Sequence, residues 1–386
     1  MPIGSDKGSF IKPGFDPLTV GPVTPIPAGA LWVTGHNSYG QLGLGDTVNR
    51  SSPTQVGAYA NWVGLSGGKE SSFGTKTDGT LWSWGRNGRG QLGLGDTISR
   101  SSPVQVGALT NWATLSSGSI AGNDRFVVAI KANGSLYAWG YNGSAQLGLG
   151  DYANRSSPVQ LGSLTTWAEC SAGANAGYAI KTDGTIWSWG SNNNGALGLN
   201  EAPGTNHSFP TQIGALTNWL KVSAGTRFVS ALKTDGTIWA WGLNSQGMLG
   251  QGNTTSYSSP VQIGALTTWL SVSSGYSQMH GITTGGALWS WGQNNSGQLG
   301  INAPGDRSSP VQVGALTTWA STSPGSSQSV ALKTDGTAWG WGYNGQGALG
   351  TGTLTDTSSP VQIGALTSWL RLAVRPVSNS TFLSKP

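Results

Sequence analysis

Charged residues are scarce in this sequence. Only 9% of its 386 residues are Asp, Glu, Lys or Arg, against about 25% in a typical soluble domain. The 20 basic and 15 acidic residues leave a formal net charge of +5 and a pI near 9.3. No cluster of Lys and Arg could follow a phosphate backbone, so nucleic acid is not expected as the main partner.

Cysteine and long apolar runs are scarcer still. The one cysteine, Cys170, excludes an internal disulfide framework and a thiolate zinc cluster, and we expect it to be a small buried residue. Residues 1–21 lack the basic start and apolar run of a secretory signal. No stretch approaches the roughly 20 apolar residues that cross a membrane. We therefore expect a soluble protein without its own export signal.

Glycine and tryptophan are abundant instead, and they recur at a fixed period. The chain holds 62 Gly and 19 Trp, and this many aromatic residues argues against disorder. The glycine that closes each Trp-Gly pair (Thr-Gly in the first) recurs every 50–55 residues. Such a period indicates one supersecondary unit per repeat. The seven glycines are Gly35, Gly85, Gly140, Gly190, Gly242, Gly292 and Gly342.

One repeat predicts four short antiparallel strands. In the fifth, these are residues 219–225, 228–233, 238–242 and 259–264, with a Thr-Asp-Gly-Thr hairpin turn at 234–237. The proline of the fourth strand suits an edge position. Four strands per repeat, without helical periodicity, predict an all-β, seven-bladed β-propeller.

The third strand of each repeat should be buried on both faces, because every blade lies between two others. Its side chains alternate, so paired tryptophans share one face and small or aliphatic residues the other. We expect the following tryptophans to be structural core: Trp32, Trp82, Trp84, Trp139, Trp187, Trp189, Trp239, Trp241, Trp289, Trp291, Trp339 and Trp341.

The two chain ends predict how the ring closes. Residues 370–374 match a first strand and 380–385 match a second, but the chain stops before the next turn. That turn and the third strand appear at 28–30 and 31–35. One blade should therefore combine two strands from each terminus, which removes the open edge of the sheet.

Residues 1–27 stand outside the repeats, which occupy 28–386. Six prolines and four glycines prevent a helix or a central strand in this arm. The arm should leave from the face that carries the Asp-Gly turns. We expect it to dock the disc onto a larger assembly through its apolar side chains, which are Phe10, Ile11, Phe15 and Leu18.

The repeats resemble those of the RCC1 family. The resemblance rests on Trp-Gly-Arg-Asn at 84–87, Gly-Gln-Leu-Gly at 90–93 and Ser-Ser-Pro-Val at 101–104, and it recurs in all seven units. It implies a seven-bladed β-propeller. It implies no single function, because the family includes a guanine-nucleotide exchange factor, an ultraviolet photoreceptor, secreted β-lactamase inhibitors and uncharacterised bacterial and phage proteins.

Departures from the family patterns favour the bacterial and phage style of repeat. Exchange factors look to need a protruding insertion, whereas the longest excess here is five residues near 118–125. The photoreceptor's Gly-Trp-Arg-His-Thr context is absent. The inhibitors would be expected to carry an export signal.

No constellation predicts catalysis, a metal or a cofactor. His36, His207 and His280 fall at non-equivalent repeat positions in different blades. Asp78, Asp183, Asp235 and Asp335 are explained by turn chemistry. Calcium at Asp46, Asp96 and Asp151 is conceivable, but clustered carboxylates are lacking. We therefore expect a non-enzyme.

Binding is better supported, by loops that differ between blades on the face opposite the Asp-Gly turns. Tyr and Arg, which dominate interfaces, are frequent in these loops. The alternative is that the loops drift because structure does not constrain them. The candidate partner-binding residues are Tyr39, Lys69, Glu70, Arg86, Arg89, Asp124, Arg125, Tyr141, Arg227, Tyr276, Tyr343 and Arg375.

Together these features favour a non-catalytic protein-interaction scaffold. The preferred hypothesis is a phage virion component, such as an appendage, a fibre tip or a capsid decoration, which the arm docks and whose loops face a partner or host surface. The alternatives are a cytoplasmic regulator of the GTPase-exchange type and an enzyme inhibitor. The protein would accordingly lie in the virion, or otherwise in the cytoplasm.

Overall fold

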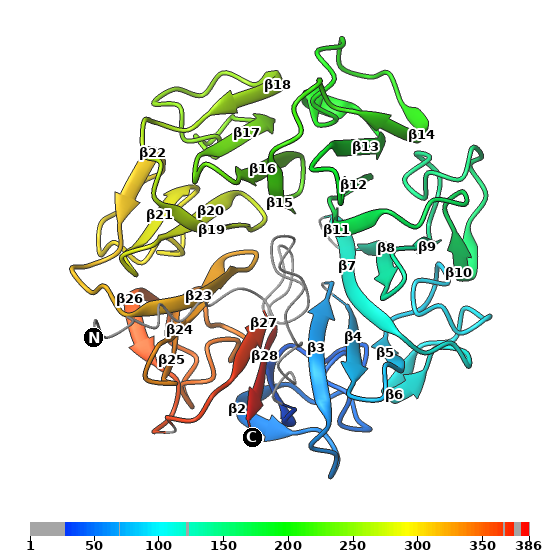
Figure 1. Ribbon diagram of the computed structural model, residues 1–386. Coiled ribbons are helices and arrows are strands. Elements are labelled where there is room, and N and C mark those ends of the chain that lie inside the picture. Colours follow the sequence, from blue (N-terminus) through cyan, green and yellow to red (C-terminus); the bar gives the residue numbers. More distant parts are fainter. Residues whose placement is uncertain (1–27, 69, 121–122, 366, 374–379, 386) are drawn as a thin grey trace, which may run out of the picture.

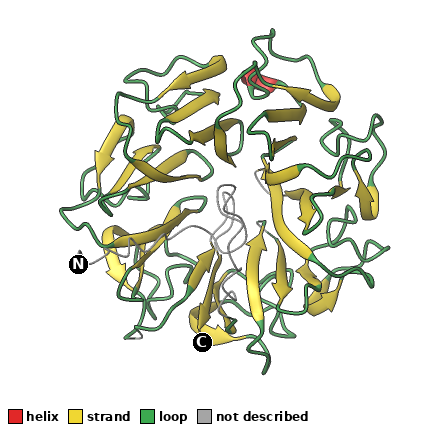
Figure 2. Ribbon diagram, viewed as in Figure 1, coloured by secondary structure: helices red, strands yellow, loops and turns green. Residues whose placement is uncertain are grey.

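The computed structural model confirms the seven-bladed propeller. It describes residues 28–68, 70–120, 123–365, 367–373 and 380–385. Seven four-stranded antiparallel sheets form a ring, with first strands toward the centre and fourth strands at the periphery (Figures 1 and 2). We number the blades 1 to 7 in chain order from the sheet that contains β1. The predicted docking arm, 1–27, lies outside the described residues.

The strands have the following bounds. The first strands of blades 1 to 7 are β27 (Arg371–Ala373), β3 (Trp62–Gly67), β7 (Trp112–Ile120), β11 (Trp167–Ala172), β15 (Trp219–Ala224), β19 (Trp269–Ser274) and β23 (Trp319–Pro324). The second strands are β28 (Ser380–Lys385), β4 (Ser71–Lys76), β8 (Asn123–Lys131), β12 (Ala176–Lys181), β16 (Phe228–Lys233), β20 (Gln278–Thr283) and β24 (Gln328–Lys333). The third strands are β1 (Ala30–Gly35), β5 (Leu81–Gly85), β9 (Leu136–Gly140), β13 (Ile186–Gly190), β17 (Ile238–Gly242), β21 (Leu288–Gly292) and β25 (Ala338–Gly342). The fourth strands are β2 (Arg50–Gln55), β6 (Arg100–Gln105), β10 (Arg155–Gln160), β14 (His207–Gln212), β18 (Tyr257–Gln262), β22 (Arg307–Gln312) and β26 (Thr357–Gln362), and a 3-10 turn, η1 (Asn193–Gly195), lies in blade 4.

The fourth strands begin two residues earlier than the sequence predicts. In blade 5 the expected range was 259–264, whereas β18 covers Tyr257–Gln262. The pairing of β17 with β18 is irregular between Ala240 and Gly242, and beyond this irregularity Gly242 pairs with Tyr257. Such a bulge accommodates Pro260, which has no N–H for a regular ladder, and lets the pairing continue upstream.

The ring closes as predicted, in blade 1. Its sheet has the order β2-β1-β28-β27, so each terminus supplies two strands (Figure 1). Leu31 pairs with Ser384 and Gly35 with Ser380. Gly29 bonds to Trp62 of blade 2 in the way that Gly79 bonds to Trp112 of blade 3, so it takes the place of a turn glycine. The closed ring therefore leaves no blade incomplete.

The apolar core lies between blades. Trp241 of β17 is fully buried and packs with blade 4, whereas Ile238 and Ala240 of the same strand pack with blade 6. The second tryptophan of each pair is fully buried, but the first is only half-buried and correspondingly less of a core residue than predicted. Those half-buried members are Trp32, Trp82, Trp187, Trp239, Trp289 and Trp339; the fully buried ones are Trp84, Trp139, Trp189, Trp241, Trp291 and Trp341.

The tryptophans that begin the first strands complete this core, and the sequence analysis did not single them out. Trp219 contacts both Trp239 and Trp241 edge-to-face, with ring centroids 6.1 and 6.3 Å apart. Their recurrence at the end of every link between blades, in five of the seven as Gly-Ala-Leu-Thr-x-Trp, was the available signal. The set comprises Trp62, Trp112, Trp167, Trp219, Trp269, Trp319 and Trp369.

Candidate interaction surface

The loop face is the side of the disc that carries the loops between first and second strands and between third and fourth strands. The opposite side, the link face, carries the second-to-third turns and the links between blades. In an antiparallel blade these two pairs of connections necessarily lie on opposite sides. The predicted partner-binding residues that the structure describes belong to the loop face.

An asparagine holds each third-to-fourth loop in one conformation. Asn87 Oδ1 accepts a hydrogen bond from the Leu92 N–H at 2.9 Å, and its Nδ2 donates to Asp96 Oδ1 at 2.9 Å. The equivalent Asn37 and Asn142 make the same contacts. These hydrogen bonds fix the backbone of the loop, so the residues that follow the asparagine, such as Gly88 and Arg89 after Asn87, have a defined position.

Each of these loops also bonds to the next blade. Gly95 N–H donates to Ser156 O at 2.8 Å, and the last loop returns to the first blade, where Gly352 N–H donates to Ser51 O at 2.9 Å. In blade 2 the buried Trp84 indole adds a bond to Gln41 O of blade 1 at 2.9 Å. The loop face is thus a continuous surface on which side chains of neighbouring blades meet.

Blades 1 and 2 bring three of the predicted residues together. Arg86 Nη1 donates to Glu70 Oε2 at 2.6 Å, and its guanidinium carbon lies 4.9 Å from the Tyr39 ring centroid. Glu70 is only 5% exposed, whereas Tyr39 is 39% exposed. Arg86 therefore neutralises a buried carboxylate while it stacks on an exposed ring.

A second arginine continues this row toward blade 3. Arg89 is exposed, and its guanidinium carbon lies 5.0 Å from the centroid of Tyr141. Among the described residues Arg89 makes no ion pair. The hydroxyl of Tyr141 lies so close to Gly143 that a Cβ there would be 2.1 Å away, so the glycine makes room for the ring. We call these two Tyr-Arg pairs, Tyr39 with Arg86 and Arg89 with Tyr141, the row; together they involve blades 1 to 3.

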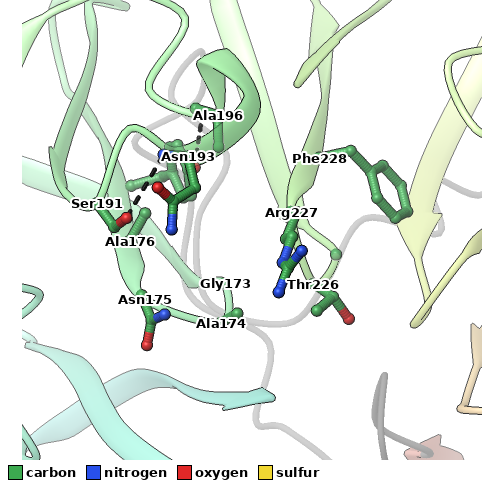
Figure 3. Close-up of a pocket in the computed structure, with 12 residues that line it drawn as sticks. Gly173, Ala174, Asn175, Ala176, Ser191, Asn193, Ala196, Thr226, Arg227 and Phe228 are labelled. Carbon is green, nitrogen blue, oxygen red and sulfur yellow. Dashed lines mark hydrogen bonds between the residues drawn. The ribbon is translucent and has the colours of Figure 1, made fainter. Parts of the chain in front are cut away.

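Arg227 faces a small depression between blades 4 and 5 (Figure 3). The depression is shallow: its empty volume of about 310 Å³ includes part of the open solvent, and Asn193 lines it from the opposite side. A bond from Ala174 N–H to Thr226 O at 3.2 Å joins its walls. At its base the Tyr178 hydroxyl donates to Ala196 O, and burial raises the pKa of this phenol. The depression can take one small polar group beside a cation.

The remaining predicted residues do not join the row. Tyr276 of blade 6 and Tyr343 of blade 7 are half-buried. No arginine of the described residues lies over either ring. Lys69 and Arg375 lie outside the described residues, and the side chains of Asp124 and Arg125 are likewise not described. Their roles stay predictions.

The aspartates considered for calcium have other partners. Arg100 Nη2 donates to Asp96 Oδ2 at 2.6 Å, and Arg50 and Arg155 pair with Asp46 and Asp151 in the same way. The backbone N–H of Ile98, together with Arg100, holds the pKa of Asp96 below its ordinary value. No group of three His, Cys, Asp or Glu that could hold a metal occurs within the described part of the chain.

The three histidines are separate and have structural partners. His36 contacts Ser38 and Gln41, and His207 contacts Glu201 at 2.8 Å. His280 is fully buried, and burial lowers its pKa to about 3. None of the hydrogen bonds described links one histidine to another or to a shared partner.

In the regions that the structure describes, no helix is sufficiently long and apolar to span a membrane.

The Asp-Gly turns of the link face are explained by their own hydrogen bonds. Asp235 Oδ1 accepts the N–H and the hydroxyl of Thr237 at 3.0 and 2.6 Å, and these bonds lower the pKa of Asp235. The same hydroxyl accepts the Trp239 indole N–H at 2.9 Å. The turn aspartates thus position a tryptophan rather than form a carboxylate ring.

Comparisons with known proteins agree with this architecture. Residues 118–379 match the model of the RCC1-like domain, and residues 28–74 and 78–121 match that of the regulator of chromosome condensation (RCC1) repeat. Over 138 residues the chain is 30% identical to the ultraviolet-B receptor UVR8 of Arabidopsis thaliana. This match covers 35% of the chain and only 31% of the receptor's length.

Solved structures show the same fold over nearly the whole chain. Yeast RCC1 (Prp20), solved bound to Kap60, superposes with a TM-score of 0.81 at 19% identity, over 93% of this chain and 89% of that one. Human WBSCR16 gives 0.80 at 17% identity, over 93% and 99%. The repeat motifs, the seven closed blades and the family matches along the chain lead to one conclusion: it belongs to the RCC1 repeat family.

Proposed function

We propose that the chain is a non-catalytic protein-interaction propeller whose loop face binds a partner through Tyr39, Arg86, Arg89 and Tyr141. The observation that carries this proposal is the presence of two Tyr-Arg pairs, one between blades 1 and 2 and the other between blades 2 and 3. Tyrosine and arginine are the residue types most often found at binding hot spots. Because Glu70 already neutralises Arg86, Arg89 is, of these two arginines, the one proposed to meet a carboxylate of the partner.

Affinity capture from the native source tests this proposal. The wild-type chain and an Arg89→Ala, Tyr141→Ala double variant are used as baits, and captured proteins are identified by mass spectrometry. Leu216→Ala, an exposed substitution on the link face, is the matched control. A partner retained by wild type and the control but lost from the double variant supports the proposal. Equal capture by all three baits contradicts it.

A finer proposal is that this scaffold is a component of a phage virion. Its support is the sequence of residues 1–27, rich in Pro and Gly, and the low charge of the whole chain. The arm would attach the disc to the particle while the loop face contacts the host surface or a further partner. Purified particles should contain the protein, and removal of residues 1–27 should abolish its incorporation. Particles without it, or unchanged incorporation, would refute this role.

A regulator of a small GTPase is the second candidate. It is supported by the fold shared with Prp20 of Saccharomyces cerevisiae, a protein described for its binding properties to Gsp1p and histones. The hairpin of β7 and β8 has nine residues in each strand where other blades have six or fewer, but an excess of five residues falls short of the protruding insertion that exchange factors look to need. Stimulated nucleotide release from a GTPase encoded beside this chain would favour regulation, and unchanged release would leave the scaffold.

A further inference from the structure

Four blades place a lysine of their own between two tryptophans on the link face. The lysine ends the second strand, and its Nζ lies 3.7–3.8 Å from the ring centroid of the third-strand tryptophan. The first-strand tryptophan lies 4.7–5.2 Å away on another side. These lysines are Lys76, Lys181, Lys233 and Lys333. Blade 3 has a looser version, with Lys131 5.7 Å from Trp112.

The two tryptophans have the same mutual geometry in each of these blades. Their rings meet edge-to-face with centroids 6.1–6.3 Å apart and interplanar angles of 76–83°. Blade 6 keeps this arrangement, because Trp269 and Trp289 lie 6.2 Å apart at 77°. The aromatic walls of the cation site are therefore present in blade 6 as well.

The lysine itself is missing from blade 6. Thr283 takes its place at the end of β20, and its hydroxyl lies 3.3 Å from the Ala287 N–H within its own turn. Gly285 stands where blades 2, 4, 5 and 7 have the turn aspartate. No cation of the described residues lies over Trp289, whose ring is half-buried, with an indole N–H that has no partner.

An exposed leucine lies in the link that precedes Trp269. Leu266 is 44% exposed, and it occupies the link position that Tyr59 has in blade 2. The Tyr59 ring lies 4.0 Å from Lys76 Nζ, so this link residue forms a third wall around the lysine. Thr284 and Gly285 are exposed in the adjoining turn, whereas Trp269 is only 3% exposed, so a side chain that arrives from solvent would meet Trp289 first.

We propose that Trp269, Trp289 and Leu266 form a binding site for the lysine side chain of a protein partner. The ligand class follows from the molecule's own lysines, which fill the equivalent sites. Indole faces attract an ammonium through their quadrupole, and the apolar walls cover the aliphatic stem. The site lies on the link face and is independent of the function proposed for the loop face.

Titration of the full-length protein with N-acetyl-lysine methylamide tests the site. Tryptophan indoles labelled with ¹⁵N report binding at single-residue resolution. The Trp289 resonance should shift with one-site saturation, while the Trp339 resonance, beside Lys333, should not. The neutral Nε-acetyl derivative should cause no comparable shift. Absence of a Trp289 shift, or an equal shift with the neutral compound, would overturn the proposal.

Two exchanges between blades sharpen the experiment. Thr283→Lys supplies an internal ammonium, and it should weaken binding of the probe by about tenfold or more, the factor expected for a cation–π contact of this size. Lys333→Thr should create a second site, with a new saturable shift at Trp339. Probe affinity unchanged by Thr283→Lys, or no shift at Trp339 in a folded Lys333→Thr protein, contradicts the assignment.

Discussion

His280 is enclosed between blades 6 and 7, with its ring 5.8 Å from Trp341 and nearly parallel to it. Its Nδ1 lies 2.7 Å from the hydroxyl of Thr322. Burial lowers the pKa of His280 from 6.5 to about 3, so the folded state keeps the imidazole neutral where the unfolded chain protonates it. Stability should therefore be complete above pH 6.5 and be lost progressively as the pH falls from 6.5 toward 3.

The expected loss between pH 8 and pH 5 is about 2 kcal/mol in the free energy of unfolding. Denaturant titrations at several pH values measure it. His280→Gln, which keeps a hydrogen-bonding side chain without a titrating group, should flatten the dependence in this window. The same slope in both proteins would mean that His280 does not control acid stability.

Trp241 shows what the second tryptophan of each pair contributes. Its indole donates to Ala196 O of blade 4 at 2.9 Å, and the ring is fully buried. Trp241→Phe should lower the free energy of unfolding by about 2–4 kcal/mol, because it leaves a small cavity and an unpaired buried carbonyl.

Trp289→Phe is the matched comparison for this change. Its indole N–H has no partner and its ring is half-buried, so the loss should be about 1 kcal/mol. Equal losses in the two variants, measured by thermal or chemical unfolding, would contradict the importance of the bond to Ala196.

At the scale of an element, the glycine that ends each third strand fixes the direction of the following loop. Gly85 has φ = +98°, and a Cβ on it would lie 2.3 Å from Glu70 O. Gly85→Ala should therefore destabilise the protein by about 2 kcal/mol or more and displace Arg86 from Glu70. Gly88→Ala in the same loop meets no atom within 4 Å and is the control.

Thermal unfolding of the two variants decides between strain and a general intolerance of side chains in this loop. A large loss for Gly85→Ala together with little change for Gly88→Ala supports strain. A comparable loss for both would show that the loop resists any added side chain.

Sequence periodicity was sufficient to predict the elements because each carries local signals. The Asp-Gly turns, the alternating third strands and the second strand of blade 5, 228–233, agree with the structure. The start of the fourth strand was wrong by two residues, because a bulge is decided by pairing across strands rather than by local sequence. Alternation along a strand predicts equal burial for Trp239 and Trp241, which share a face. It could not predict that Trp239, which lies nearer the start of the strand, is only half-buried.

The interaction surface was predictable only in its parts. Variation between loops identified Tyr39, Arg86, Arg89 and Tyr141, but not their contacts, which join blades about 50 residues apart. Glu70 was predicted as a binding residue, and the structure adds that it is buried beneath Arg86. The lysine sites were not predicted, because a lysine at the end of a strand has no distinctive sequence signal. Each site forms only where the second strand meets the tryptophans of the first and third strands.

For the whole molecule, closure of blade 1 predicts a clear difference between cutting and rearranging the chain. Deletion of 370–386 removes β27 and β28 and exposes the edge of β1, so we expect a large fall in melting temperature and aggregation. A circular permutant that joins residue 385 to residue 28 through an Asp-Gly turn and opens at 235–236 should keep the wild-type melting temperature. Differential scanning calorimetry compares them, and a permutant as unstable as the deletion would contradict this account.

The shared blade also sets a timetable for synthesis of the chain. The Ser380 hydroxyl bonds to His36 O, and these residues are 344 positions apart. A ribosome that adds about 5–20 residues per second needs roughly 20–70 s between the two. During that interval β1 and β2 have no inner partner, while blades 2 to 7 can form in order behind them. The nascent protein is therefore an open arc with one unpaired edge until β27 and β28 have been synthesised, and a chaperone that recognises such edges would act on it only before that point.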